Sequence, residues 1–124
     1  MKARRLRPAH RDARGTILDV LAGVKVDAVT LITSKKGSVR GNHYHRRTVQ
    51  YTFLISGRMR FVTLTPKNRF RSLTLRPGDL IESRPGEPHT FLALEDSTFL
   101  SLSRGPRRGA NFEDDTYRLS RPLA

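Results

Sequence analysis

The chain of 124 residues contains no cysteine and no tryptophan. The missing cysteine excludes disulfides, thiolate catalysis, cysteine-based zinc fingers and iron–sulfur ligation. No apolar run approaches the ~20 residues of a membrane-spanning helix, and the basic N-terminus lacks the apolar stretch of a secretory signal. We therefore expect one domain that is cytoplasmic and makes no contact with a membrane.

Acidic residues are also scarce, since 24 Lys and Arg face 11 Asp and Glu, for a formal net charge of +13. A positive surface attracts phosphates, so nucleic acid and anionic small molecules are the first partners to consider. The basic residues are spread along the chain, and no nucleic-acid-binding module is visible. We therefore expect an anionic small molecule rather than nucleic acid. The alternative interpretation is a solvated surface biased toward arginine.

No stretch shows a sustained helical period of 3.6 residues. From residue 16 to residue 102, short β-rich runs such as Thr16–Leu21, Ala28–Thr33 and Val49–Ile55 alternate with turns rich in Gly and Pro. About nine short strands predict an all-β sandwich or barrel. The expected organisation is a basic arm over residues 1–16, a barrel over residues 17–104 and a tail over residues 105–124 that packs on the barrel.

The histidines offer a candidate site. His43 and His45 are two residues apart within a strand pattern, so their imidazoles share one face and both can reach one metal ion. His89 opens another predicted strand and would supply the third nitrogen. On the following strand Gln50 and Tyr51 point to opposite faces, and the sequence does not say which face looks inward.

Glycine, histidine and glutamine recur at fixed intervals in two groups. The first group is Gly37, five residues, His43-Tyr44-His45, four residues, Gln50, six residues, Gly57; the second is Gly78, five residues, Arg84-Pro85-Gly86, two residues, His89. The pair resembles the two motifs of the cupin superfamily and implies an RmlC-like cupin, a double-stranded β-helix or jelly-roll barrel. Cupins include isomerases, epimerases, dioxygenases, decarboxylases and sugar-binding regulators, so the resemblance alone does not settle the reaction.

The cupin resemblance also implies a metal site, with His43, His45, Gln50 and His89 as its ligands and Zn, Ni, Fe or Mn as the divalent ion. Gln50 stands where the motif usually has a glutamate. A neutral amide leaves the full +2 charge on the cation, so affinity should be lower and Lewis acidity higher. Arg84 and Ala93 also depart from the second motif, where Pro and Asn are usual.

A narrower resemblance involves the run Arg40-Gly41-Asn42-His43-Tyr44-His45 and the tail Asp115-Thr116-Tyr117. Both are similar to cupins of bacterial polysaccharide and nucleotide-sugar biosynthesis, among them the dTDP-4-dehydro-6-deoxyglucose ketoisomerases. The resemblance implies an isomerase or epimerase that acts on a nucleotide sugar. The alternatives are a metal-dependent dioxygenase-type cupin and a cupin that binds its ligand without turnover.

Proton transfer on a 4-keto sugar needs a base next to the carbonyl and a group that returns the proton. We expect His43 or His45 as the base and Tyr51 or Tyr44 as the proton donor. Arg40 and Arg60 are candidates for the diphosphate, because a guanidinium meets phosphate oxygens in two-point fashion. The alternative interpretation makes these tyrosines packing residues and these arginines surface residues.

A barrel of ~110 residues has a limited core and open sheet edges, so we expect a homodimer.

Overall fold

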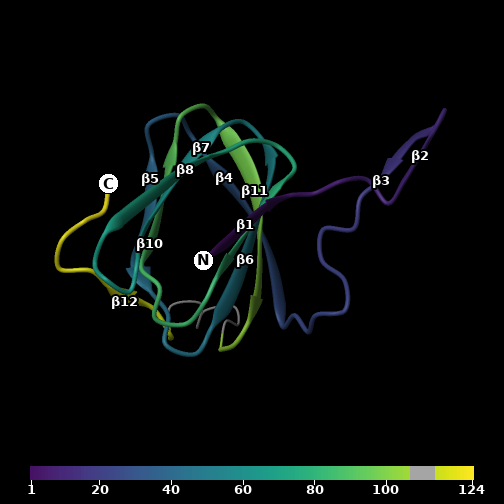
Figure 1. Cartoon of the computed structure of the whole chain (residues 1–124). Coiled ribbons are helices and arrows are strands. Elements are labelled where there is room, and N and C mark those ends of the chain that lie inside the picture. Colours follow the sequence, from purple (N-terminus) through teal and green to yellow (C-terminus); the bar gives the residue numbers. More distant parts are fainter. Residues whose placement is uncertain (107–113) are drawn as a thin grey trace.

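The computed structural model describes residues 1–106 and 114–124 and consists of two five-stranded antiparallel sheets that face each other and a separate two-stranded hairpin (Figure 1). The β6 sheet has the strand order β1-β9-β6-β11-β4: β1 (Lys2–Arg5), β9 (Asp79–Ser83), β6 (Val49–Ser56), β11 (Ser97–Arg104) and β4 (Ala28–Ser34). The β10 sheet has the order β12-β5-β10-β7-β8: β12 (Tyr117–Arg118), β5 (Val39–Tyr44), β10 (His89–Ala93), β7 (Met59–Leu64) and β8 (Phe70–Leu75). The predicted all-β barrel is confirmed, and no helix of the described residues is long and apolar enough to cross a membrane.

The core lies between the two sheets because alternate residues of each strand point inward. Leu54, Met59, Phe61 and Ile81 are completely buried there. On β6 the inward face is the one that carries Gln50, Thr52 and Leu54, which answers the question that the sequence left open.

A second apolar cluster covers the outer face of the β6 sheet. Phe53, Leu80 and Leu102 are buried under the segment that runs from Leu6 to Val26. The run Thr16–Leu21 was expected to be one strand, but its β structure ends at Ile17. The apolar side chains that follow pack on this outer face instead of pairing in a ladder.

The first sixteen residues, expected as an arm, contain β1 and β2 (His10–Asp12). β1 pairs with β9 at the edge of the β6 sheet, while β2 and β3 (Gly15–Ile17) form a hairpin that projects from the barrel (Figure 1).

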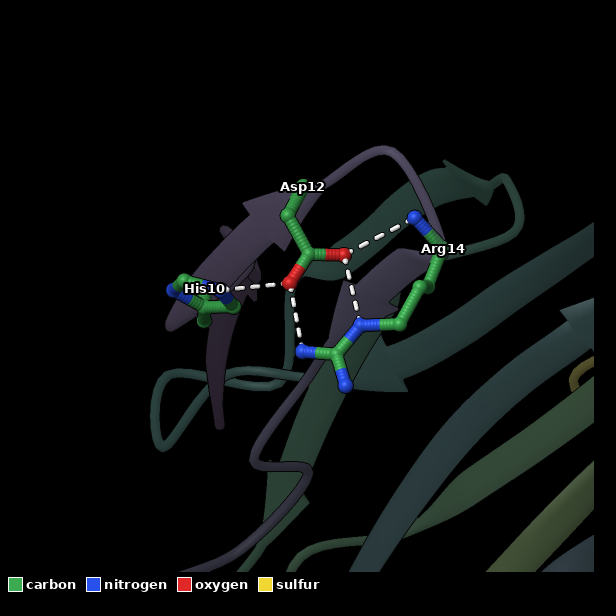
Figure 2. Close-up of polar contacts among 3 residues, drawn as sticks. All are labelled: His10, Asp12 and Arg14. Carbon is green, nitrogen blue, oxygen red and sulfur yellow. Dashed lines mark hydrogen bonds and ion pairs between the residues drawn. The ribbon is translucent and has the colours of Figure 1, made fainter.

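A small ionic cluster closes the tip of this hairpin (Figure 2). The Asp12 carboxylate accepts hydrogen bonds from the Arg14 guanidinium at 2.7 Å and from the Arg14 backbone N–H at 2.9 Å, and it lies 2.9 Å from Nε2 of His10. These hydrogen bonds lower the pKa of Asp12 from 3.8 to about 2. The Arg14 side chain contributes most, followed by the Arg14 backbone N–H and by His10. The three residues are exposed, so the cluster organises the turn without adding to the core.

Candidate functional site

Three histidines meet at one end of the barrel. His43 lies on β5, His45 directly follows that strand, and His89 is the first residue of β10, where it pairs in register with His43. The ring centroids are 4.7–5.2 Å apart, and one ring nitrogen of each histidine lies within 4.8 Å of the others.

Close contact between β5 and β10 depends on Gly41. Its φ of +104° belongs to the left-handed region that favours glycine, and a Cβ at this position would lie 2.7 Å from the backbone oxygen of His89. The loop before β10 is also tied to the site, since the Gly86 N–H donates to the His45 carbonyl at 2.6 Å. These backbone contacts fix His89 beside His43.

The histidines line a cavity of about 320 Å³ between the two sheets. His43, His89 and Phe91 belong to the wall formed by the β10 sheet, whereas Gln50 and Ser101 belong to the β6 sheet. The C-terminal segment completes the rim, and its contributions are Thr116 and Arg118. The cavity therefore has three imidazoles on one wall and an amide and a hydroxyl on the other.

His45 is held at both ring nitrogens. Nδ1 lies 2.9 Å from the backbone carbonyl oxygen of Asp115, and Nε2 lies 3.2 Å from Oε1 of Gln50. Both partners are carbonyl oxygens that only accept, and we assign the proton to Nδ1, whose contact is the shorter of the two. In the neutral ring Nε2 then has a lone pair that faces another acceptor, the amide oxygen of Gln50. A cation or a proton between these two atoms would satisfy both.

His89 is neutral. Burial lowers its pKa well below the ordinary value of 6.5, and the neighbouring His43 and His45 lower it further. The Glu87 carbonyl acts in the opposite direction and is outweighed. Only 1% of His89 is exposed, and neither of its ring nitrogens makes a hydrogen bond of good geometry within the described part of the chain. A buried polar atom of this kind normally has a partner, so His89 is available to a ligand.

These observations fit a divalent transition metal. Neutral imidazole is a common ligand of such ions, and three imidazoles with an open position are sufficient for a catalytic site. His43, His45 and His89 would hold the ion, and the oxygen of Gln50 is next to them. A bound ion would supply Lewis acidity toward a carbonyl oxygen.

The structure does not bring every predicted residue to this cavity. Tyr51 points to the outer face of the β6 sheet and packs in the cluster around Phe53. Tyr44 follows His43 on β5, so its side chain points to the other face of the strand, where it stacks on Tyr117 with ring centroids 5.4 Å apart. Strand alternation explains both placements, because each tyrosine is one residue away from an inward-facing side chain.

Only one of the two predicted arginines lines the cavity. Arg60 is exposed on β7 and does not line the cavity. Arg40 does line it, although its guanidinium also donates to Oγ of Ser34 at 2.8 Å and to the Thr33 carbonyl at 3.0 Å. Arg40 thus braces β5 against β4 and still has unused N–H donors.

Sequence reasoning did not identify the role of the C-terminal segment. Asp115, Thr116 and Arg118 all reach the site, and they are about seventy residues from the histidine pair in sequence. The only signal was the similarity of Asp115-Thr116-Tyr117 to the tail of related cupins, which gave no role to any side chain.

Comparison with solved structures gives the same fold. The dTDP-4-dehydrorhamnose 3,5-epimerase of Sulfolobus tokodaii has a TM-score of 0.75 and 23% identity, over 90% of this chain and 72% of that one. The rmlC epimerase of Mycobacterium tuberculosis has a TM-score of 0.78 and 22% identity, over 94% and 66%. The sugar 3,4-ketoisomerase QdtA of Thermoanaerobacterium thermosaccharolyticum, in complex with TDP, has a TM-score of 0.79 and 17% identity, over 96% and 88%.

At these identities the likeness establishes the fold, and the cupin expectation is confirmed. No curated protein sequence matches the chain. Residues 10–73, just over half of the chain, match the family described as Polysaccharide biosynthesis C-terminal domain. The chain therefore has the fold of the rmlC epimerase and belongs to the Polysaccharide biosynthesis C-terminal domain family.

Proposed function

We propose that the histidine cavity binds the 4-keto sugar of a nucleotide sugar and that the chain is a nucleotide-sugar isomerase. The observation that carries the proposal is the position of His45, whose Nδ1 lies 2.9 Å from the Asp115 carbonyl oxygen and whose Nε2 faces Gln50 in the lining of the cavity. A neutral imidazole with a fixed tautomer is a suitable general base near neutral pH. The similarity to QdtA, a 3,4-ketoisomerase with bound TDP, supports the same substrate class.

The distribution of groups around the cavity favours isomerisation over epimerisation. All three imidazoles come from the β10 sheet and the residue that follows β5. The opposite wall offers Gln50 and Ser101, and none of the described residues that line the cavity is a tyrosine. Epimerisation needs an acid on the face opposite the base, whereas a 3,4-keto shift is completed by one base on one face. The phenols of Tyr51 and Tyr44, expected as donors, lie on outer faces of the sheets.

In the proposed reaction Nε2 of His45 removes the proton from C3 of the 4-keto sugar. The C3–H electron pair forms the C3=C4 bond, and the carbonyl electrons move to the C4 oxygen. The hydroxyl proton on the C3 oxygen then passes to the C4 oxygen, and the His45 imidazolium returns its proton to C4. The product is the 3-keto sugar, and no atom or electron is gained or lost.

The charge of the rim fits an anionic substrate. A cavity of about 320 Å³ is at the small end of the ~300–1,000 Å³ range of ligand sites, so it would enclose the sugar and leave the nucleotide outside. Arg118 and Arg40 line the cavity. Guanidinium groups at the rim would bind the diphosphate by charge-assisted hydrogen bonds, and the net charge of +13 would attract it.

The test is solvent exchange. Purified protein is incubated in D₂O with TDP-4-keto-6-deoxyglucose, and proton NMR follows loss of the C3 signal and formation of the 3-keto sugar. We expect exchange in the native chain and a fall of about 10²–10⁴-fold in the His45→Asn variant, as is typical when a general base is removed. The exposed His10→Asn is the matched control. Binding with no exchange would favour a non-catalytic cupin, and the absence of both binding and exchange with TDP or UDP sugars would refute the proposal.

A metal centre is the second candidate, because the lone pairs of His45 Nε2 and Gln50 Oε1 converge beside two further imidazoles. It predicts one equivalent of a transition metal in protein purified without chelator, and loss of that metal in His43→Ala and His89→Ala. Full exchange activity in chelator-treated protein would separate proton transfer from metal-dependent chemistry, including oxygenase activity.

We also propose that the chain forms a homodimer through β4. This edge strand exposes 63% of Val29 and 65% of Leu31, and a long apolar edge of this kind is normally covered. Antiparallel pairing of two β4 strands would extend the β6 sheet and bury both side chains. Light scattering should give twice 14.1 kDa for the native chain and 14.1 kDa for Leu31→Lys; a monomeric native chain would contradict the proposal.

A further inference from the structure

The C-terminal segment that contains Asp115 contacts both the proposed base and the turn that carries it. Asp115 is only 3% exposed, and its carbonyl oxygen accepts from Nδ1 of His45 at 2.9 Å. This carbonyl is the acceptor that favours a proton on Nδ1 of His45.

The carboxylate of Asp115 makes a different set of contacts. It accepts hydrogen bonds from the backbone N–H groups of Arg46, Arg47 and Thr48, at 3.2, 2.8 and 2.9 Å, and from Oγ1 of Thr48 at 2.8 Å. These residues form the turn between His45 at the end of β5 and Gln50 on β6. The Asp115 carboxylate therefore fixes the turn between His45 and Gln50, whose Nε2 and Oε1 atoms face each other.

The rest of the segment keeps Asp115 in place. β12 pairs with β5, so that Tyr117 lies opposite Tyr44 and stacks on it. The Arg46 guanidinium lies 4.1 Å from the centre of the Tyr117 ring, within the range of a cation–π contact. The segment is thus attached both to β5 and to the turn that follows it.

We propose that Asp115 is a positioning residue of the isomerase, an inference that rests on the proposed function. Its carboxylate holds the turn at residues 46–48, and this holds its own carbonyl against Nδ1 of His45. The proton therefore stays on Nδ1, and Nε2 stays unprotonated toward the substrate. An imidazole released from this contact carries its proton mainly on Nε2, as in water, and cannot act as the base.

The experiment measures the tautomer of His45 by ¹⁵N NMR at one fixed pH, without substrate, in Asp115→Ala, Asp115→Asn and the native chain. Alanine removes all four acceptor contacts, whereas asparagine can place its carbonyl oxygen where Oδ2 accepts three of the four hydrogen bonds. We expect the fraction protonated on Nε2 to rise from the native chain to the asparagine variant and to be largest in the alanine variant. The neighbouring exposed carboxylate provides the matched control, Asp114→Ala, which should leave the tautomer unchanged.

Turnover gives the second readout. In Asp115→Ala kcat should fall about 10–100-fold, as is common when the group that orients a functional histidine is removed, while KM changes less. Asp115→Asn should recover most of this loss. A residue with a purely structural role would lower the melting temperature but leave the folded protein with the native tautomer and kcat.

The two proposals fail in different ways. If the native chain turns over no 4-keto sugar, the isomerase proposal fails and the tautomer measurement still stands. A native ring protonated on Nε2, or a folded Asp115→Ala protein with the native tautomer, overturns the role of Asp115. If Asp115→Ala does not fold, Thr48→Val and Asp115→Asn decide the question, and a native tautomer in both overturns the inference.

Discussion

Replacing Gly41 by alanine should destabilise the barrel at the point where β5 approaches His89. The residue has a φ of +104°, and left-handed backbone costs an L-residue about 1–2 kcal/mol. The added Cβ would also lie 2.7 Å from the His89 carbonyl oxygen and 3.0 Å from Cα of Thr90, whereas ordinary contacts begin at 3.4 Å. The strands must therefore separate by a few tenths of an ångström or more, and overpacking of this kind costs about 1–3 kcal/mol.

The chain provides a matched control in Gly78. Its φ is +95°, but nothing lies within 4 Å of the position that a Cβ would occupy. Gly78→Ala should therefore carry the backbone cost alone, about 1–2 kcal/mol, while Gly41→Ala carries about 2–5 kcal/mol. Replacing glycine by alanine also lowers the conformational entropy of the unfolded chain, which stabilises both variants to the same extent and cancels in the comparison.

Urea unfolding of the two variants measures this difference. Solvent exchange with the 4-keto sugar then reports on the site, because movement of β5 away from β10 displaces His43 from His89. We expect Gly41→Ala to be less stable than Gly78→Ala by about 1–3 kcal/mol and to exchange more slowly. Equal stability of the two variants would refute the argument that β5 is held against β10 by the missing side chain.

Two further predictions concern the hairpin and the core. The Asp12 carboxyl should titrate near pH 2 by NMR, and Arg14→Ala should raise this pKa toward 3.8. Because the pKa of Asp12 is depressed in the folded hairpin, the ionised carboxylate stabilises the hairpin above about pH 3.8, and this contribution is lost as the pH falls through about 2. A titration of Asp12 near 3.8 in the native chain would show that the cluster does not form in solution. Leu54→Ala should lower the free energy of unfolding by about 2–5 kcal/mol, because Leu54 is completely buried. The adjacent Ile55→Ala, at a position 44% exposed, should cost much less, and equal losses in urea unfolding would contradict the assigned inward face of β6.

Much of the barrel follows from local patterns. Short β-rich runs between turns predict the β6 and β7 strands. The same pattern failed at Leu18, Val20 and Leu21, which are apolar without belonging to a strand. Those side chains cover the outer face of the β6 sheet, and a sequence pattern does not distinguish burial in a ladder from burial under a loop.

The site was predicted in part. His43, His45 and His89 were identified by spacing, because motif intervals follow strand and turn lengths. Tyr51 was considered a candidate because the inward face of β6 was not known, and one residue of register decides between the cavity and the outer cluster. Asp115 was assigned no role, because its partners lie about seventy residues earlier and are reached through backbone atoms.

The sequence alone therefore determined an all-β chain, its turns and the residues that form a three-imidazole group, since these depend on side-chain chemistry and short intervals. Only the tertiary structure decided which face of β6 looks inward, which arginines reach the cavity and which carbonyl groups contact the ring nitrogens of His45. Those outcomes depend on how distant strands pair and on where backbone carbonyls and N–H groups point. Such groups occur at every residue, so the identity of a residue does not reveal which of them will meet.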